Sequence, residues 1–375
     1  MCTSITINSK DGNTIVGRSM ENAVFMDSNV FFRPEGYPYV QDKIILCKKF
    51  ELLGADVADL KVMNDAKLLT WKGLYSFIGM NALGTGLATN GMNSEGLVTG
   101  DMTLTCSMYE SGKGAPANSV LWYPYVTNWI LSTCANCEDV KNNLPNLVVT
   151  NPLGDLMPEK YKGFLLHFPV NDAQGNAIVV EYTDGQLHIY DNTEIGVLTN
   201  DPIFPWQTQN LINYANITPV NQSEHTGTRF SVSSPSQGTG FIGLPASSTP
   251  VDRFVRAAMM VNYAFPQQTG KEAVNLAIHV LNTVDIPFGI SRTKTDAQPV
   301  SGESDFTEWI TVSDTQNLKY YVRMYDSPSV FLIDFKQLLE TYKDDLSQLL
   351  EITIDIPVKD LAIDLTEEYT SAAAM

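Results

Sequence analysis

Strands and helices are predicted in blocks along the chain. Apolar and polar positions alternate over Cys2–Asn8, turn-forming residues occupy 10–13, and Thr14–Gly17 returns, which is the pattern of a β-hairpin. Similar patterns predict strands at 76–80, 97–102, 164–170, 177–182, 186–190, 196–200, 309–312, 319–324 and 329–334, and a turn at 90–96. Helices are predicted at 117–134, 138–144, 251–264 and 270–284. Such blocks indicate an α+β protein in which helices cover antiparallel sheets.

No segment reads as a clear linker between domains. The stretch 221–248 is rich in Ser, Gly and Pro, but it also contains Phe230, Phe241, Ile242 and Leu244. These apolar side chains favour a packed loop. We therefore predict one domain over residues 1–375, with an acidic tail from about residue 355.

The composition excludes several classes of protein. With 44% hydrophobic residues, the chain of 375 residues has enough apolar surface for a large core, which excludes a disordered protein. The 24 Lys and Arg against 42 Asp and Glu give a net charge of −18, which argues against a nucleic-acid partner. No apolar run is long enough for a membrane span, and the N-terminus lacks the features of a secretory signal. We expect a cytoplasmic protein with no membrane partner.

Metal and serine-hydrolase motifs are weak or missing in the sequence. Cys134 and Cys137 form a C-x-x-C pair, but a structural zinc site needs a second pair of ligands at matching spacing. The four histidines stand singly, and no G-x-S-x-G motif occurs. A metal-binding regulator that uses the two cysteines is the most remote of the alternatives.

Cys2 has a position that suits covalent catalysis. Removal of Met1, which is common when the next side chain is small, would leave one residue with both a thiol and a free α-amine. An α-amine has an ordinary pKa of about 8, so near neutral pH it can accept the thiol proton. The alternative is that Cys2 is an ordinary residue of the first strand. Arg18 ends the returning strand of the hairpin, beside the first residues, where a cation would stabilise a thiolate.

Five segments resemble the choloylglycine hydrolase family, which includes conjugated bile salt hydrolases and penicillin V acylases. In the family's order they are Met1–Ile5, Gly17–Met20, Asn90–Leu97, Val197–Pro202 and Asp252–Arg256, and the likeness extends from residue 1 to about 334. The resemblance implies a four-layer αββα sandwich of the N-terminal-nucleophile hydrolase type. It also implies catalytic roles for Cys2 as nucleophile, Arg18 beside the thiolate, Asn200 in the oxyanion hole and Arg253 as a second arginine.

Two positions depart from the family's pattern. The family usually has aspartate where this chain has Glu21, which keeps the carboxylate that holds the nucleophile's amine but lengthens it. Thr103 stands where the family often has asparagine or tyrosine near the oxyanion hole. Ala23, Val24, Phe25 and Met26 match the family's acyl-pocket loop, although the same apolar residues could be buried packing residues.

The resemblance implies an amidohydrolase that acts on a small-molecule N-acyl amide and needs no metal or organic cofactor. A conjugated bile salt or penicillin V is the expected substrate, with an N-acyl lipid such as an acyl-homoserine lactone as the alternative. A non-catalytic binding protein on the same scaffold is the rival from another class. The stretch 238–250 resembles the family's subunit-contact region, which implies a homotetramer.

Overall fold

The N-terminal hairpin lies in the middle of the first of two large sheets. The computed structural model describes residues 1–42, 67–151, 164–342, 352–354 and 356. In the hairpin, Cys2 lies opposite Met20 and Ser4 lies opposite Arg18. The strand order is β15 (Val197–Leu198), β1 (Cys2–Asn8), β2 (Thr14–Asn22), β19 (Ser304–Asp314), β20 (Lys319–Met324) and β21 (Phe331–Asp334), with β18 (Ser291–Arg292) also on β19.

The second sheet contains the strands that carry the remaining predicted β patterns. Its order is β14 (Gln186–Asp191), β13 (Ala177–Thr183), β12 (Leu166–Asn171), β8 (Val98–Gly100), β7 (Ala88–Asn93), β6 (Phe77–Asn81), β3 (Val30–Arg33) and β22 (Ile352–Ile354), with β9 (Met102–Thr103) on β12. Short pairs form between β4 (Pro38–Tyr39) and β5 (Trp71–Lys72), and between β10 (Val120–Trp122) and β11 (Val148–Thr150). β7 continues to Asn93, so of the turn predicted at 90–96 only the residues after Asn93 form a turn.

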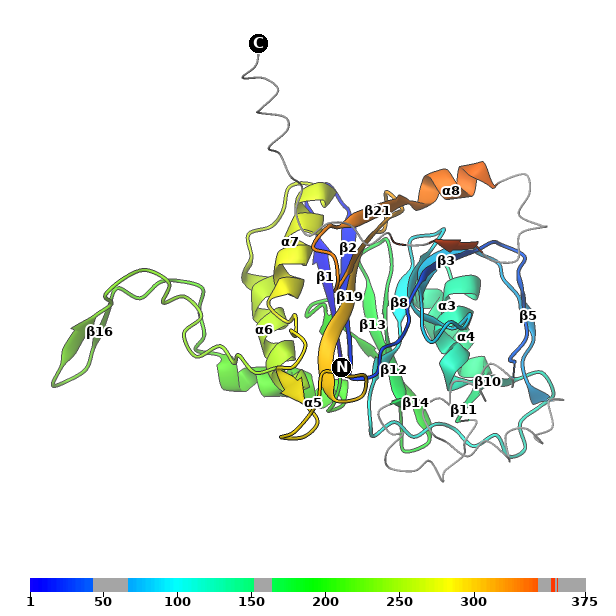
Figure 1. The fold of residues 1–375 in the computed structure, drawn as a ribbon, viewed down its shortest axis with the longest axis horizontal. Helices are drawn as coiled ribbons and strands as arrows, with labels where there is room; N and C mark the ends of the chain where they lie inside the picture. The colour runs from blue at the N-terminus through cyan, green and yellow to red at the C-terminus, as the bar shows by residue number, and fades with distance from the viewer. Residues whose placement is uncertain (43–66, 152–163, 343–351, 355, 357–375) are drawn as a thin grey trace, which may run out of the picture.

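Helices cover the outer face of each sheet, which gives four layers in the order αββα (Figure 1). α6 (Pro250–Tyr263) and α7 (Gly270–Asn282) pack on the first sheet, and α3 (Val126–Thr133) packs on the second sheet beside α4 (Cys137–Asn143). α7 begins with a capping box between Thr269 and Glu272, which satisfies donors at the start of the helix. The predicted sandwich is confirmed. The other α-helices of the described residues are α5 (Phe204–Asn210) and α8 (Phe335–Thr341).

The prediction of one helix over 117–134 is wrong in its first half. Residues Val120–Trp122 form strand β10, Tyr123–Tyr125 make a 3-10 turn, and the α-helix begins only at Val126. Pro124 explains the difference, because proline disfavours helical geometry in the residue before it and lacks the N–H that a helix interior needs. All four aromatic side chains of this segment are nevertheless buried.

The stretch 221–248 forms an arm, so the prediction of a packed loop is wrong for most of it. β16 (Glu224–Thr226) and β17 (Ser231–Ser233) pair as a hairpin that projects far from the two sheets (Figure 1). The side chains of Phe230 and Ile242 are 56% and 70% exposed. Of the four apolar residues named above, Phe241 and Leu244 are partly buried, and the ring of Phe241 contacts that of Tyr263 of α6.

Among the described residues, no helix is both long and apolar enough to cross a membrane. The predicted acidic tail falls almost wholly outside the described residues.

Candidate active site

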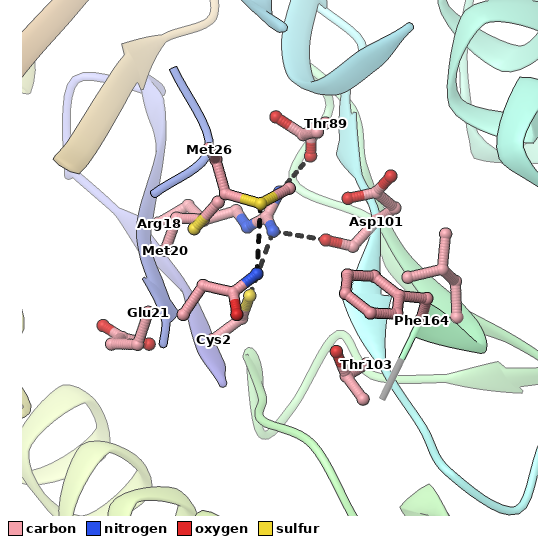
Figure 2. Close-up of a pocket in the computed structure, with 11 residues that line it drawn as sticks. Cys2, Arg18, Met20, Glu21, Met26, Thr89, Asp101, Thr103 and Phe164 are labelled. Carbon is pink, nitrogen blue, oxygen red and sulfur yellow. Dashed lines mark hydrogen bonds between the residues drawn. The ribbon is translucent and has the colours of Figure 1, made fainter. Parts of the chain in front are cut away.

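Cys2 lies at the wall of a small cavity between the two sheets. The cavity has a volume of about 40 Å³, and Cys2, Arg18, Met20 and Met26 line it from the first sheet and the loop after it. Asp101, Thr103 and Phe164 line the opposite side (Figure 2), and Leu166 of β12 also lines the cavity. The thiol is thus buried but faces a space large enough for a water-sized group.

Arg18 holds a guanidinium against the thiol. Its Nη2 atom lies 3.2 Å from Cys2 Sγ, and the side chain is almost completely buried. The carbonyl oxygens of Thr89 and Asp101 accept hydrogen bonds from Nη1 and Nη2 (Figure 2). The ring of Trp309 lies 5.5 Å from the guanidinium carbon. These contacts hold the guanidinium in place. The position of Arg18 beside the first residues is the one that the predicted hairpin implied.

Gly100 makes room for Arg18, and sequence analysis did not single it out. A Cβ atom at residue 100 would collide with Arg18 Nη1 and would lie 2.8 Å from the carbonyl oxygen of Thr89. Real Cβ atoms essentially never approach another atom so closely. Only glycine therefore lets β8 pass this close to the guanidinium.

Asn200 and Arg253 meet at the backbone of Cys2. Asn200 Oδ1 accepts hydrogen bonds from the Cys2 N–H at 2.6 Å and from Arg253 Nη2 at 2.8 Å, while its Nδ2 donates to the Thr103 carbonyl at 2.9 Å. Arg253 Nη1 also donates to the Cys2 carbonyl and to Thr3 Oγ1, at 2.5 and 2.7 Å. Burial lowers the pKa of the Arg253 guanidinium, and the charge of Glu21 opposes that change.

Glu21 is buried on β2 and points away from the thiol and Arg18 (Figure 2). Burial raises the pKa of its carboxyl, and the nearby charge of Arg253 counteracts this rise. Thr307 Oγ1 donates to Glu21 Oε1 at 3.1 Å, whereas Oε2 has no hydrogen-bond partner among the described residues. The Met1 carbonyl accepts the Glu21 backbone N–H at 2.8 Å, so Glu21 lies beside the bond that must be cut to free Cys2.

A buried network that the sequence did not reveal holds the segment around Asn200. Gln207 Nε2 donates to the carbonyl oxygens of Asn200 and Pro202 at 2.6 and 3.0 Å, and its Oε1 accepts from the Thr199 hydroxyl at 2.9 Å. His167 Nε2 lies 2.8 Å from the Thr199 carbonyl oxygen, an obligate acceptor, so this ring nitrogen donates.

The other ring nitrogen of His167 lies 2.9 Å from Glu181 Oε1. Neither side chain of this pair is exposed. The same carboxylate oxygen accepts the N–H of Phe204 at 3.0 Å. The histidine therefore links the carbonyl next to Asn200 to a fixed carboxylate on β13.

The residues predicted to form the acyl pocket are divided between two places. Met26 lines the cavity beside Cys2, and so does Thr103. Phe25 instead lies against Phe288 and Phe306, at the edge of a second and larger cavity. Ala23 and Val24 are half-buried and are not among the residues that line either cavity.

Cys134 and Cys137 are buried free thiols. Burial raises the pKa of the Cys134 thiol to about 12. Within the described ranges, no group of three or more His, Cys, Asp or Glu side chains is placed to hold a metal ion.

A family model described as linear amide C–N hydrolases of the choloylglycine hydrolase family matches residues 2–348. The chain is 27% identical over 342 residues to a bile salt hydrolase/transferase of Clostridium perfringens (strain 13 / Type A). The aligned region covers 90% of this chain and 93% of that protein. The chain is also 29% identical over 338 residues to a bile salt hydrolase/transferase of Lactiplantibacillus plantarum. Here the aligned region covers 88% of this chain and 91% of that protein.

The fold is also similar to a solved structure. The crystal structure of the C2A mutant of conjugated bile acid hydrolase from Clostridium perfringens superposes with a TM-score of 0.74 at 25% sequence identity. The similarity covers 97% of this chain and 99% of that one.

Proposed function

The chain belongs to the choloylglycine hydrolase family of linear amide C–N hydrolases, and we propose that it cleaves its substrate through Cys2 as an N-terminal nucleophile. The observation that carries this proposal is the distance of 3.2 Å between Arg18 Nη2 and Cys2 Sγ, two buried side chains that line the same cavity. A guanidinium at that distance stabilises the thiolate, which is the reactive form of cysteine.

Removal of Met1 turns the Cys2 nitrogen into the base of the reaction. This nitrogen is within 2.6 Å of Asn200 Oδ1, so the freed amine has an acceptor that holds its orientation. It takes the proton of its own thiol, and Sγ attacks the carbonyl carbon of the amide. The protonated amine then gives the proton to the leaving nitrogen as the C–N bond breaks, and water cleaves the resulting thioester.

Asn200 is our proposed donor to the oxyanion. One hydrogen of its Nδ2 is used by the Thr103 carbonyl, which leaves the second for the oxygen that becomes negative in the tetrahedral intermediate. Loss of such a donor typically lowers kcat by about 10² to 10³. Arg253 holds Asn200 Oδ1 and thereby the direction of the amide.

Gln207 and His167 act in this proposal as positioning residues. Both bind the main chain of residues 199–202 from buried sites, and neither lines the cavity beside Cys2. A misplacement of about 1 Å at a catalytic group can lower the rate about 10²-fold. Holding the backbone of Asn200 on both sides therefore contributes to catalysis without contact with the substrate.

For the substrate, we propose a conjugated bile salt first and penicillin V second. The names of the two relatives and the match to a family of linear amide hydrolases support this order. Met20, Met26, Phe164 and Leu166 give the cavity an apolar wall, and its volume of about 40 Å³ suits the part of the acyl group nearest the reacting carbonyl. An N-acyl lipid, such as an acyl-homoserine lactone, is the alternative with the same apolar acyl half.

We further propose that residues 1–375 fold as a single cytoplasmic domain and assemble as a homotetramer. The arm formed by 221–248 supports the assembly, because exposed apolar side chains on a projecting hairpin need a partner surface. Light scattering that gave the mass of a monomer would contradict the tetramer.

The test of the proposed function is amine release from glycocholate, taurocholate, penicillin V and an acyl-homoserine lactone. Wild type is compared with Cys2→Ala, and circular dichroism checks that both are folded. We expect release that depends on Cys2, and the fastest substrate identifies the acyl class. No release from any of the four by enzyme that has lost Met1 would contradict the proposal and favour a binding protein.

A further inference from the structure

Neighbouring residues of one segment line two different cavities. The side chain of Met26 faces the small cavity beside Cys2, whereas Phe25 and Asp27 line a second cavity of about 430 Å³. Glu308 links the two cavities, because its side chain lines the second cavity and its Oε2 and Oε1 atoms accept the backbone N–H of Met26 at 3.1 and 3.2 Å. The second cavity is large enough for a small organic molecule.

Four aromatic rings form one wall of this second cavity. Phe306 lies at their centre, and its ring centroid is 5.5 Å from that of Phe25, 5.3 Å from that of Phe288 and 5.1 Å from that of Tyr325. Aromatic rings carry partial negative charge on their faces, and they attract a cation placed within about 6 Å.

Three carboxylates surround the same space. Asp27, Glu308 and Asp326 line the cavity, and no lysine or arginine does so among the described residues. None of the three forms an ion pair within the part of the chain that the structure describes. Burial raises the pKa of the Glu308 carboxyl to about 7, with a further rise from Asp27, while N–H groups of Met26 and Ser28 lower it.

We propose that this cavity binds an organic cation: an amine or quaternary ammonium group with apolar substituents. The carboxylates repel anions, and the aromatic wall offers a metal ion no ligands but attracts the polarised methyl or methylene groups around a charged nitrogen. A neutral apolar molecule would bury the carboxylates without compensating their charge. The proposal does not depend on the chemistry of Cys2.

The first test uses the wild-type protein and two small probes of the same shape. Choline carries the positive charge, and 3,3-dimethylbutan-1-ol is its uncharged carbon analogue. We expect ligand-observed NMR to detect choline binding at millimolar concentrations, with the analogue at least about tenfold weaker. Equal binding of the two probes, or no binding of choline, would overturn the proposal.

Two variants then locate the binding. Glu308→Gln removes one charge but keeps an oxygen for the Met26 N–H, and Phe306→Leu removes the central ring. Each should weaken choline about five- to tenfold. Asp184→Asn removes a charge from the exposed turn between β13 and β14 and is the matched control. Variants that bind choline like wild type, or a control that weakens it as much, would place the binding elsewhere and refute the assignment.

Discussion

Replacement of Gly100 by alanine should displace Arg18 from the nucleophile. The new methyl group would collide with Arg18 Nη1, and it cannot move aside because the Thr89 carbonyl oxygen would lie 2.8 Å from it. The guanidinium can yield only by giving up its hydrogen bonds to the Thr89 and Asp101 carbonyl groups. The substitution thus reaches Cys2 without touching it.

The size of the effect follows from the charge separation. At 3.2 Å and an effective dielectric constant of about 20, a guanidinium and a thiolate attract each other by about 5 kcal/mol. A retreat of about 1.5 Å reduces this to about 3.5 kcal/mol. The loss of about 1.5 kcal/mol corresponds to a roughly tenfold slower reaction at Cys2. Overpacking should also destabilise the fold by about 1–3 kcal/mol.

The assay is the rate at which iodoacetamide alkylates Cys2 at pH 7, followed by mass spectrometry of the N-terminal peptide. This readout separates Cys2 from the exposed thiol of Cys106. Gly112→Ala is the control, because its Cβ would meet only a methyl group of Thr150 at 3.3 Å. Folded Gly100→Ala enzyme that is alkylated and turns over at the wild-type rate would refute the reasoning.

Three further predictions concern buried polar groups. Gln207→Met should lower kcat about 10- to 100-fold with little change in KM, because the carbonyl groups of Asn200 and Pro202 lose their hydrogen-bond donor. The control is Gln209→Met, on the exposed face of α5, which should not lower kcat. Equal kinetics of the two variants would contradict the positioning role of Gln207. Burial raises the folded-state pKa of Glu21 despite the nearby charge of Arg253, so stability contributed by this carboxyl is lost as pH rises above about 4.5. Glu21→Gln should therefore gain stability relative to wild type as pH rises, measured by urea unfolding, and a difference that does not change with pH would contradict this. The folded-state pKa of Glu308 is raised to about 7, so the folded form binds more protons and stability contributed by this group is lost as pH rises from about 4.5 to 7. Glu308→Gln should therefore gain up to about 3 kcal/mol relative to wild type between pH 5 and pH 8, and parallel stability curves for the two proteins would refute this.

The sequence predicted the parts of the site that depend on local pattern. The alternation over the first 17 residues defines a hairpin, and a hairpin necessarily brings Arg18 back to the first residues. Asn200 and Arg253 are far away in sequence, so only the family resemblance pointed to them. The structure places both within hydrogen-bond distance of the Cys2 backbone.

The features that the sequence did not reveal depend on contacts between distant elements. Gly100 is one of 25 glycines, and its importance comes from a guanidinium on another sheet. His167 and Gln207 stand outside any motif, because their partners are backbone carbonyl groups that have no signature in sequence. The exposed arm was predicted to be packed, since an apolar residue in the sequence does not tell whether its partner lies in the same chain.

Mass spectrometry of enzyme quenched during turnover tests the central claim most directly. With the fastest substrate from the amine-release assay, we predict an N-terminal peptide that begins at Cys2, lacks Met1 and carries the acyl group of the substrate on the cysteine sulfur. The adduct should disappear once the substrate is consumed and should be absent from Cys2→Ser. Sustained hydrolysis by enzyme that retains Met1, or an acyl group found on another residue, would contradict the account.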